Sequence, residues 1–403
     1  MLVSSTGGLL FVFNRNLASL IFVIIIIFGL FLIGKQIKKS VFYSSFLALF
    51  VVLALFVINF IYAINLQSLT QYSFFGVITF TTILTLVYFN NQVNKEGFIN
   101  SLYFVLKLIL FHSLFSFILY FIVKDHLDLL TSEYHDTETY NYLFYYSVKE
   151  GSIINFFGLD FHRNAGIFWE PGILQIYLNI LLFLEVNVFK RNKRLLALII
   201  IGILSTYSTT GLLLLMIQLI YFLKTESKKY IAIFLITLIA IPLYFFSSIN
   251  FNEKIYGERE FSFQKRLFDL TQPFFIALER PITGIGLDID QFQEVREEFY
   301  ITSNLNEMFG EVGIEQKLET TSKGSTNSVM YMLAGMGFPT AILFIFMLFK
   351  QNIINQKKNL FFFIVLVSVM SEPLLLRPFF FMFIISGFIH FFYKIASHKK
   401  QLE

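Results

Sequence analysis

The chain has 403 residues, of which 56% are hydrophobic and only 14% are charged, and its formal net charge is +4. So much apolar surface excludes a soluble protein of this length, and continuous apolar runs do not fit a transmembrane barrel, whose strands would alternate. The absence of cysteine excludes disulfides and thiolate metal sites. We therefore predict an all-α, polytopic membrane protein that forms a single membrane domain over residues 1–403.

Apolar runs of roughly 20 residues predict membrane-spanning helices. In chain order, the expected spans are 17–33, 41–64, 72–89, 99–123, 172–189, 195–223, 230–246, 328–349 and 360–393. The sixth span is interrupted by STYSTTG at 205–211, and the last by SEP at 371–373 and by RP at 377–378. Non-helical backbone inside a membrane needs protein or water around it. We expect each interrupted span to be two half-helices whose hinges face one internal cavity, which gives about eleven segments.

Basic residues cluster at 35–39, 190–194, 224–229, 350–358 and 394–400. Short loops rich in Lys and Arg mark the cytoplasmic side. All five clusters can lie there only if both interrupted spans cross the membrane twice. This scheme places the N-terminus outside, the C-terminus inside and two polar loops outside, at 124–164 and 250–325. The larger loop is expected to be a lid or a binding loop.

Charged residues gather at the start of the fifth span, in FHRNAGIFWEPGILQIYLN at 161–179, which holds the only tryptophan, Trp169. Pro171 favours the first helical turn, so the helix is expected to begin there with unpaired N–H groups and partial positive charge. With Arg163 just upstream, this arrangement suits an anion, most naturally a phosphate. The alternative is that Arg163 and Glu170 are ordinary interfacial side chains.

Three further candidates come from the long outer loop and the last span. Arg266 lies in the amphipathic stretch FQKRLF, where phosphate binding and interfacial anchoring are both open. Arg280 precedes a proline and is foremost a turn residue, with substrate binding as the alternative. Glu372 and Arg377 lie in an apolar region, where ionisable residues pair with each other or serve a function.

Two polar residues mark expected helix starts. Asn327 precedes an apolar run and is predicted to cap that helix, whose positive end would face the same cavity as the helix from Pro171. The Thr209 hydroxyl either hydrogen-bonds to the backbone of its own helix or contacts the substrate in the cavity. The DxD at 288–290 is either a metal site for a nucleotide sugar or an acidic turn, and we favour the turn. The histidines show no ligand spacing, so we predict no metal and no cofactor.

Four motifs in this order resemble the Wzy-type O-antigen polymerases and their relatives, the O-antigen ligases: RNAGIFWEPG, STYSTTG, RPITGIGLDIDQF and STNSVMYMLAGMGFP. The likeness covers roughly residues 163–350. It implies a glycosyltransferase of the bacterial inner membrane that uses neither metal nor nucleotide sugar. Its substrates, as both donor and acceptor, would be undecaprenyl-diphosphate-linked glycans on the periplasmic face. The resemblance also implies membrane lipids and a chain-length regulator as partners. It implies no nucleic-acid partner.

Carried over to matching positions, the resemblance implies that Arg163 and Arg266 hold the diphosphate, with Glu170 beside them as a candidate proton acceptor. The remaining substrate-binding candidates are Trp169, Thr209, Arg280, Asn327 and Arg377. A polymerase moves the growing chain onto a fresh lipid-linked repeat, whereas a ligase moves the finished chain onto lipid A–core.

The family's ligases carry a functional histidine in the large outer loop, but this chain has none between His162 and His390, which favours a polymerase of O-antigen or capsular polysaccharide. A ligase remains an alternative. So does a polysaccharide flippase, because transporters also use broken helices.

Overall fold

The computed structural model describes residues 2–8, 15–33, 37–91, 97–131, 136–148, 152–156, 159–189, 192–226, 260–302 and 324–402. The membrane helices of the N-terminal part are α3 (Arg15–Ile33), α4 (Lys39–Tyr62), α5 (Leu69–Asn91) and α6 (Gly97–Val123), after the short α1 (Leu2–Ser5). They are followed by α7 (Pro171–Asn187), α8 (Lys193–Ser205), α9 (Thr209–Glu226), α14 (Ser328–Lys350), α15 (Lys358–Ser371) and α16 (Pro378–Leu402).

Within the described part of the chain, five helices are long and apolar enough to cross a membrane, namely α4, α5, α6, α14 and α16. Shorter apolar helices accompany them at 17–31, 171–187, 209–222 and 358–371. This arrangement confirms the predicted all-α, polytopic membrane protein. The span expected at 230–246 lies outside the described residues.

Both interrupted spans form pairs of helices, as the sequence predicted. The first break separates α8 from α9 and places Tyr207 in the left-handed region at φ 47°. The second break separates α15 from α16, between Ser371 and Pro378. In both cases the polar or proline residues stop the helix although the apolar run continues.

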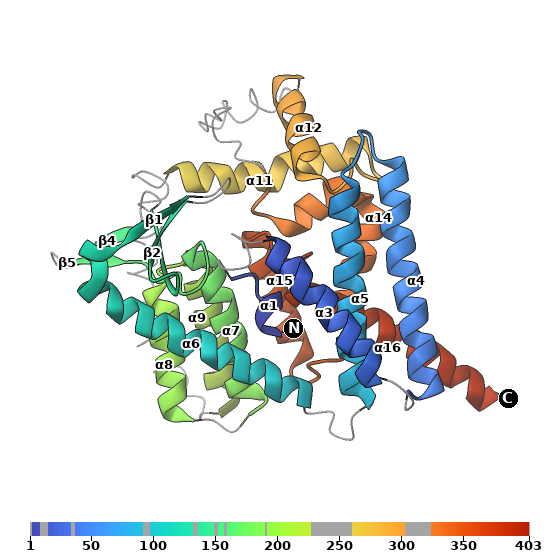
Figure 1. The fold of residues 1–403 in the computed structure, drawn as a ribbon, viewed down its shortest axis with the longest axis horizontal. Coiled ribbons are helices and arrows are strands. Elements are labelled where there is room, and N and C mark those ends of the chain that lie inside the picture. The colour runs from blue at the N-terminus through green and yellow to red at the C-terminus, as the bar shows by residue number, and fades with distance from the viewer. Residues whose placement is uncertain are drawn as a thin grey trace.

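Helix α7 lies in the interior of the bundle. Every residue from Pro171 to Glu185 is buried, and the helix packs against α6, α8, α9 and α15. Over these residues the helix is apolar except for Gln175, Asn179 and Glu185, and their side chains find hydrogen-bond partners inside the protein; a mostly apolar helix belongs in such a position. Helix α16 forms a second centre, because it packs on α4, α5 and α14 (Figure 1).

The polar loop at 124–164 contains small sheets that the sequence analysis did not predict. Strands β1 (Asp128–Thr131), β2 (Asp136–Tyr140) and β3 (Phe144–Ser147) pair antiparallel, and β4 (Ile153–Phe156) forms a hairpin with β5 (Leu159–His162). In β2, the side chains of Thr137 and Thr139 are buried. This alternation, in residues suited to a pleated surface, explains the strand.

The polar loop at 250–325 contributes two helices, α11 (Glu260–Glu279) and α12 (Ile289–Thr302). Figure 1 shows α11 across one end of the bundle, with α12 projecting beyond it. Helix α11 packs on α14 and on α12. The loop therefore covers the start of a membrane helix.

The last turn of α4 is joined to a segment far along the chain. Asn59 donates from Nδ2 to the carbonyl oxygens of Thr283 and Gly335, at 2.8 and 2.7 Å. Gly284, at φ +69°, lies so close to α14 that an added Cβ would be 2.4 Å from the carbonyl of Gly335. The glycines of the GIG motif thus permit a close backbone approach. Asp288 caps α12 through the backbone N–H groups of residues 290 and 291, which is the acidic turn that we favoured.

Candidate functional site

The fifth span begins as predicted, with Glu170 at the N-cap and Pro171 as the first residue of α7. Upstream, Arg163 is half-buried and donates from Nε to the carbonyl of Thr206 at 3.2 Å and from Nη2 to that of Tyr207 at 3.3 Å. These carbonyls end α8, where a cation is favourable. Arg163 therefore ties the start of α7 to the break between α8 and α9.

Arg266 connects three elements that are distant in the sequence. It lies on α11, its Nη2 is 3.8 Å from Oε1 of Glu372, and its Nη1 donates to Oγ1 of Thr210 at 3.4 Å. The Glu372 side chain is 3% exposed and that of Arg266 is 36% exposed. The Glu372 carboxylate is thus buried inside the protein, while the Arg266 guanidinium remains partly exposed at the protein surface.

Glu372 contacts an arginine that the sequence did not associate with it. The sequence left open whether Glu372 pairs with Arg377 or serves a function, and the structure shows an ion pair with Arg266. Arg377 is exposed, and its guanidinium lies 5.8 Å from the ring centre of Trp169. Arg377, in the second helix break, therefore lies at cation–π distance from Trp169, and both residues are candidates from the sequence.

The starts of three helices meet at Glu372 and Arg266. A Cβ added to Gly172, in the first turn of α7, would lie 2.0 Å from Oε1 of Glu372. Thr210, in the first turn of α9, accepts from Arg266. Ser328, the first residue of α14, donates from Oγ to the carbonyl of Glu372 at 2.6 Å. Each helix start carries roughly half a positive charge, so the starts and Arg266 together suit an anion.

The remaining sequence candidates fall into two groups. Asn327 is the N-cap of α14, and its side chain accepts from the N–H groups of residues 329 and 330, as predicted. Thr209 is the first residue of α9, next to the cluster. Arg280, in contrast, is exposed just beyond the opposite end of α11 from Arg266. At 1.5 Å per residue this separation is roughly 20 Å, so Arg280 does not belong to the same cluster.

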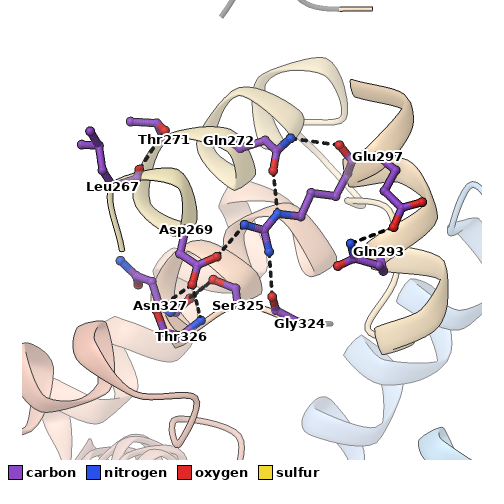
Figure 2. Close-up of polar contacts among 11 residues, drawn as sticks. Leu267, Asp269, Thr271, Gln272, Gln293, Glu297, Gly324, Ser325, Thr326 and Asn327 are labelled. Carbon is purple, nitrogen blue, oxygen red and sulfur yellow. Dashed lines mark hydrogen bonds and ion pairs between the residues drawn. The ribbon is translucent and has the colours of Figure 1, made fainter. Parts of the chain in front are cut away.

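A buried ion pair in the polar loop at 250–325 was missed by the sequence analysis. Arg296 on α12 is 0% exposed, and its Nη2 lies 2.6 Å from Oδ1 of Asp269 on α11 (Figure 2). Its Nε donates to Oε1 of Gln272 at 2.5 Å, and Nη1 donates to the carbonyl of Gly324 at 2.7 Å. Burial lowers the pKa of Arg296, and the charge of Asp269 acts in the opposite direction. No sequence spacing pairs these two residues, because their contact depends on how α11 and α12 pack.

Asp269 also holds the residue that precedes the cap of α14. Its Oδ2 accepts from the backbone N–H of Thr326 at 2.8 Å and from the Thr326 hydroxyl at 2.7 Å (Figure 2). Asp269 lies three residues after Arg266, on the same face of α11. The only signal in the sequence was thus an acidic residue one turn from a candidate arginine.

Comparison with known families matches residues 195–345 to the O-antigen ligase family model. The matched residues include most of α8, all of α9, α11 and α12, and most of α14, and therefore Arg266 and the start of α14. No curated protein and no solved structure matches the chain. The match falls on three of the four motifs that suggested the resemblance, and it confirms the resemblance. Over residues 195–345 the chain is therefore similar to the O-antigen ligase family, and this match, with the multi-pass helical fold, supports the superfamily of O-antigen polymerases and ligases.

Proposed function

We propose that the protein is a polysaccharide polymerase of the bacterial inner membrane, with its site on the periplasmic face. Its substrates are undecaprenyl-diphosphate-linked oligosaccharide repeats, and its product is O-antigen or capsular polysaccharide. The observation that carries this proposal is the position of Arg266, beside Glu372 and at the meeting point of the starts of α7, α9 and α14.

The reaction requires stabilisation of a leaving group. A hydroxyl of the acceptor glycan forms a bond to the anomeric carbon of the donor. The bond from that carbon to the diphosphate breaks, and its electron pair leaves with the lipid diphosphate. Arg266 and the positive helix starts oppose the negative charge that develops there. The hydroxyl proton passes to a carboxylate, for which Glu170 at the N-cap of α7 is our candidate.

Two sequence facts bear on the choice between polymerase and ligase. The chain has no histidine between His162 and His390, which favours a polymerase if ligases depend on a histidine in that loop. The matched family model is named for ligases, so ligation to lipid A–core is the second candidate.

The glycans of a deletion strain distinguish a polymerase from a ligase. Loss of a polymerase leaves single repeats on the core, and loss of a ligase accumulates lipid-linked polymer. Repeats trapped on the cytoplasmic face would instead indicate a flippase.

The arginines are tested with purified lipid-linked repeats. Arg266→Ala and Arg163→Ala should each reduce chain extension to a small residual rate while the protein remains folded. Lysine should restore little activity at either position, because it lacks the planar, two-pronged donor geometry of arginine. Chain extension at the wild-type rate by Arg266→Ala would refute the proposed role of the helix-start cluster.

Glu170→Gln tests the proton acceptor, because glutamine keeps the size of the side chain but cannot take a proton. General base catalysis contributes on the order of 10²–10⁴-fold, so the variant should bind lipid-linked repeats normally and turn them over at least about a hundredfold more slowly. Turnover near the wild-type rate would eliminate this role, and the arginines and helix starts would then account for catalysis.

A further inference from the structure

We infer that Arg296 is a positioning residue for Arg266 and that it acts through Asp269 and the start of α14. This inference rests on the proposed function, because it assigns the buried ion pair of the outer loop a part in holding the diphosphate-binding arginine. Arg296 itself has no route to the substrate, since its side chain is wholly buried between α11 and α12.

The first step is the fixation of Asp269. Arg296 binds one of its carboxylate oxygens at 2.6 Å, and the guanidinium carbon lies 4.5 Å from the ring centre of Phe268. With Gln272 and Gly324 as further acceptors, the guanidinium is held on three sides. Such a buried, charge-assisted contact leaves the Asp269 carboxylate little freedom.

The second step leads from Asp269 to the start of α14. The other carboxylate oxygen accepts two hydrogen bonds from Thr326, which precedes the N-cap of that helix. Two residues later, Ser328 donates to the carbonyl of Glu372 at 2.6 Å and accepts from the backbone N–H of Leu374 at 2.7 Å. The Asp269 carboxylate therefore determines where the backbone of Glu372 lies.

The third step returns to α11 and closes a ring of contacts. Glu372 reaches Arg266 at 3.8 Å, and Arg266 lies one helical turn before Asp269. We call this set of five residues the contact ring: Arg266, Asp269, Thr326, Ser328 and Glu372. Arg296 is outside the contact ring and fixes the position of its member Asp269. A shift of the Asp269 carboxylate moves the start of α14, then the backbone of Glu372, and then the Glu372 carboxylate that Arg266 contacts.

A double-mutant cycle tests the inference, because residues that act through one another give non-additive effects. Turnover, KM and melting temperature are measured for Arg296→Lys, Arg266→Ala and the double variant, per folded molecule, with purified lipid-linked repeats. A misplacement of about 1 Å can lower turnover by as much as about a hundredfold. We therefore expect Arg296→Lys to lower kcat by at least about tenfold in the wild-type background. In the Arg266→Ala background, it should lower the residual rate by less than about twofold.

Two further variants keep the test decisive. Glu297→Gln changes the exposed neighbour of Arg296 on the same helix, and it should leave kcat, KM and melting temperature unchanged. Thr326→Val removes only the hydroxyl bond to Asp269, so it supplies the same cycle if Arg296→Lys does not fold. It should lower kcat with Arg266 present and have no effect without it.

Each outcome has a separate meaning. Equal losses of kcat with and without Arg266 would mean that Arg296 does not act through Arg266, and the inference would be wrong while the proposed function stands. Full activity of Arg266→Ala alone would overturn the proposed role of Arg266, and this inference with it. An effect of Arg296→Lys on melting temperature alone, with kcat unchanged, would also refute positioning.

Discussion

Replacement of Gly172 by alanine should disturb the Arg266–Glu372 pair without removing a charge. The new Cβ would lie 2.0 Å from Oε1 and 3.0 Å from Cδ of Glu372, whereas ordinary contact begins at 3.4 Å. The carboxylate would have to move by about 1.4 Å to reach ordinary contact. Because the Glu372 side chain is 3% exposed, its surroundings must shift with it.

The expected cost in stability is small, because two effects oppose each other. Overpacking of a buried site costs about 1–3 kcal/mol, whereas alanine in place of glycine in a helix contributes about 0.5–1 kcal/mol. If the whole shift lengthened the ion pair from 3.8 Å to about 5.2 Å, the Coulomb term would weaken by about 1 kcal/mol at an effective dielectric constant of about 20. Arg266 is more than one-third exposed, and solvent screening reduces that loss to a few tenths of a kcal/mol, roughly.

Activity should respond far more than stability, because the reaction needs Arg266 in place. We expect Gly172→Ala to lower the free energy of unfolding by no more than about 2 kcal/mol and to lower kcat at least about tenfold. The assay combines thermal unfolding in detergent with chain extension on purified lipid-linked repeats. Gly76→Ala on α5 is the matched control, because its nearest neighbour would be a Leu53 methyl at 3.9 Å, and it should leave turnover unchanged.

One outcome would contradict this prediction. Wild-type turnover and melting temperature in Gly172→Ala would show that Glu372 does not rest firmly on α7, and the reasoning about the helix starts would fail.

Two further predictions concern topology and the last turn of α4. Single cysteines at Asn192 and Lys228 should resist an impermeant thiol reagent in intact cells while one at Glu294 reacts, and labelling at Lys228 would mean that 195–223 crosses the membrane once. Asn59→Leu removes the side-chain donor to the Thr283 carbonyl and the acceptor of the Tyr72 hydroxyl, which should lower the free energy of unfolding by about 1–3 kcal/mol; an equal loss in the exposed control Thr70→Leu on α5 would contradict this cause.

The features that the sequence predicted correctly depend on local chemistry. Pro171 starts a helix because its ring suits the first turn, and Asn327 caps α14 because a short amide reaches the N–H groups of the first turn. The two helix breaks follow in the same way from polar residues and prolines inside apolar runs. Each of these signals lies within a few residues of the feature that it predicts.

The features that were missed depend on contacts between distant segments. The contact between Glu372 and Arg266 was not predicted, because only the packing of α11 over the helix starts brings these two residues together. Arg296 and Asp269 meet only because α12 packs on α11. The strands at 128–147 are four or five residues long, too short for their alternation to stand out in a chain this rich in aromatic residues.

The hydrogen bonds of Asn59 constrain the order in which the protein can be assembled during synthesis. Its acceptors, Thr283 and Gly335, come 224 and 276 residues later. At about 5–20 residues per second, a ribosome needs roughly 11–45 s to reach the first of them. Throughout that interval an apolar helix carries an amide that lacks its final partners, which is costly in lipid. The nascent N-terminal helices therefore remain an incomplete intermediate, open to membrane chaperones and proteases, until the second half of the chain arrives.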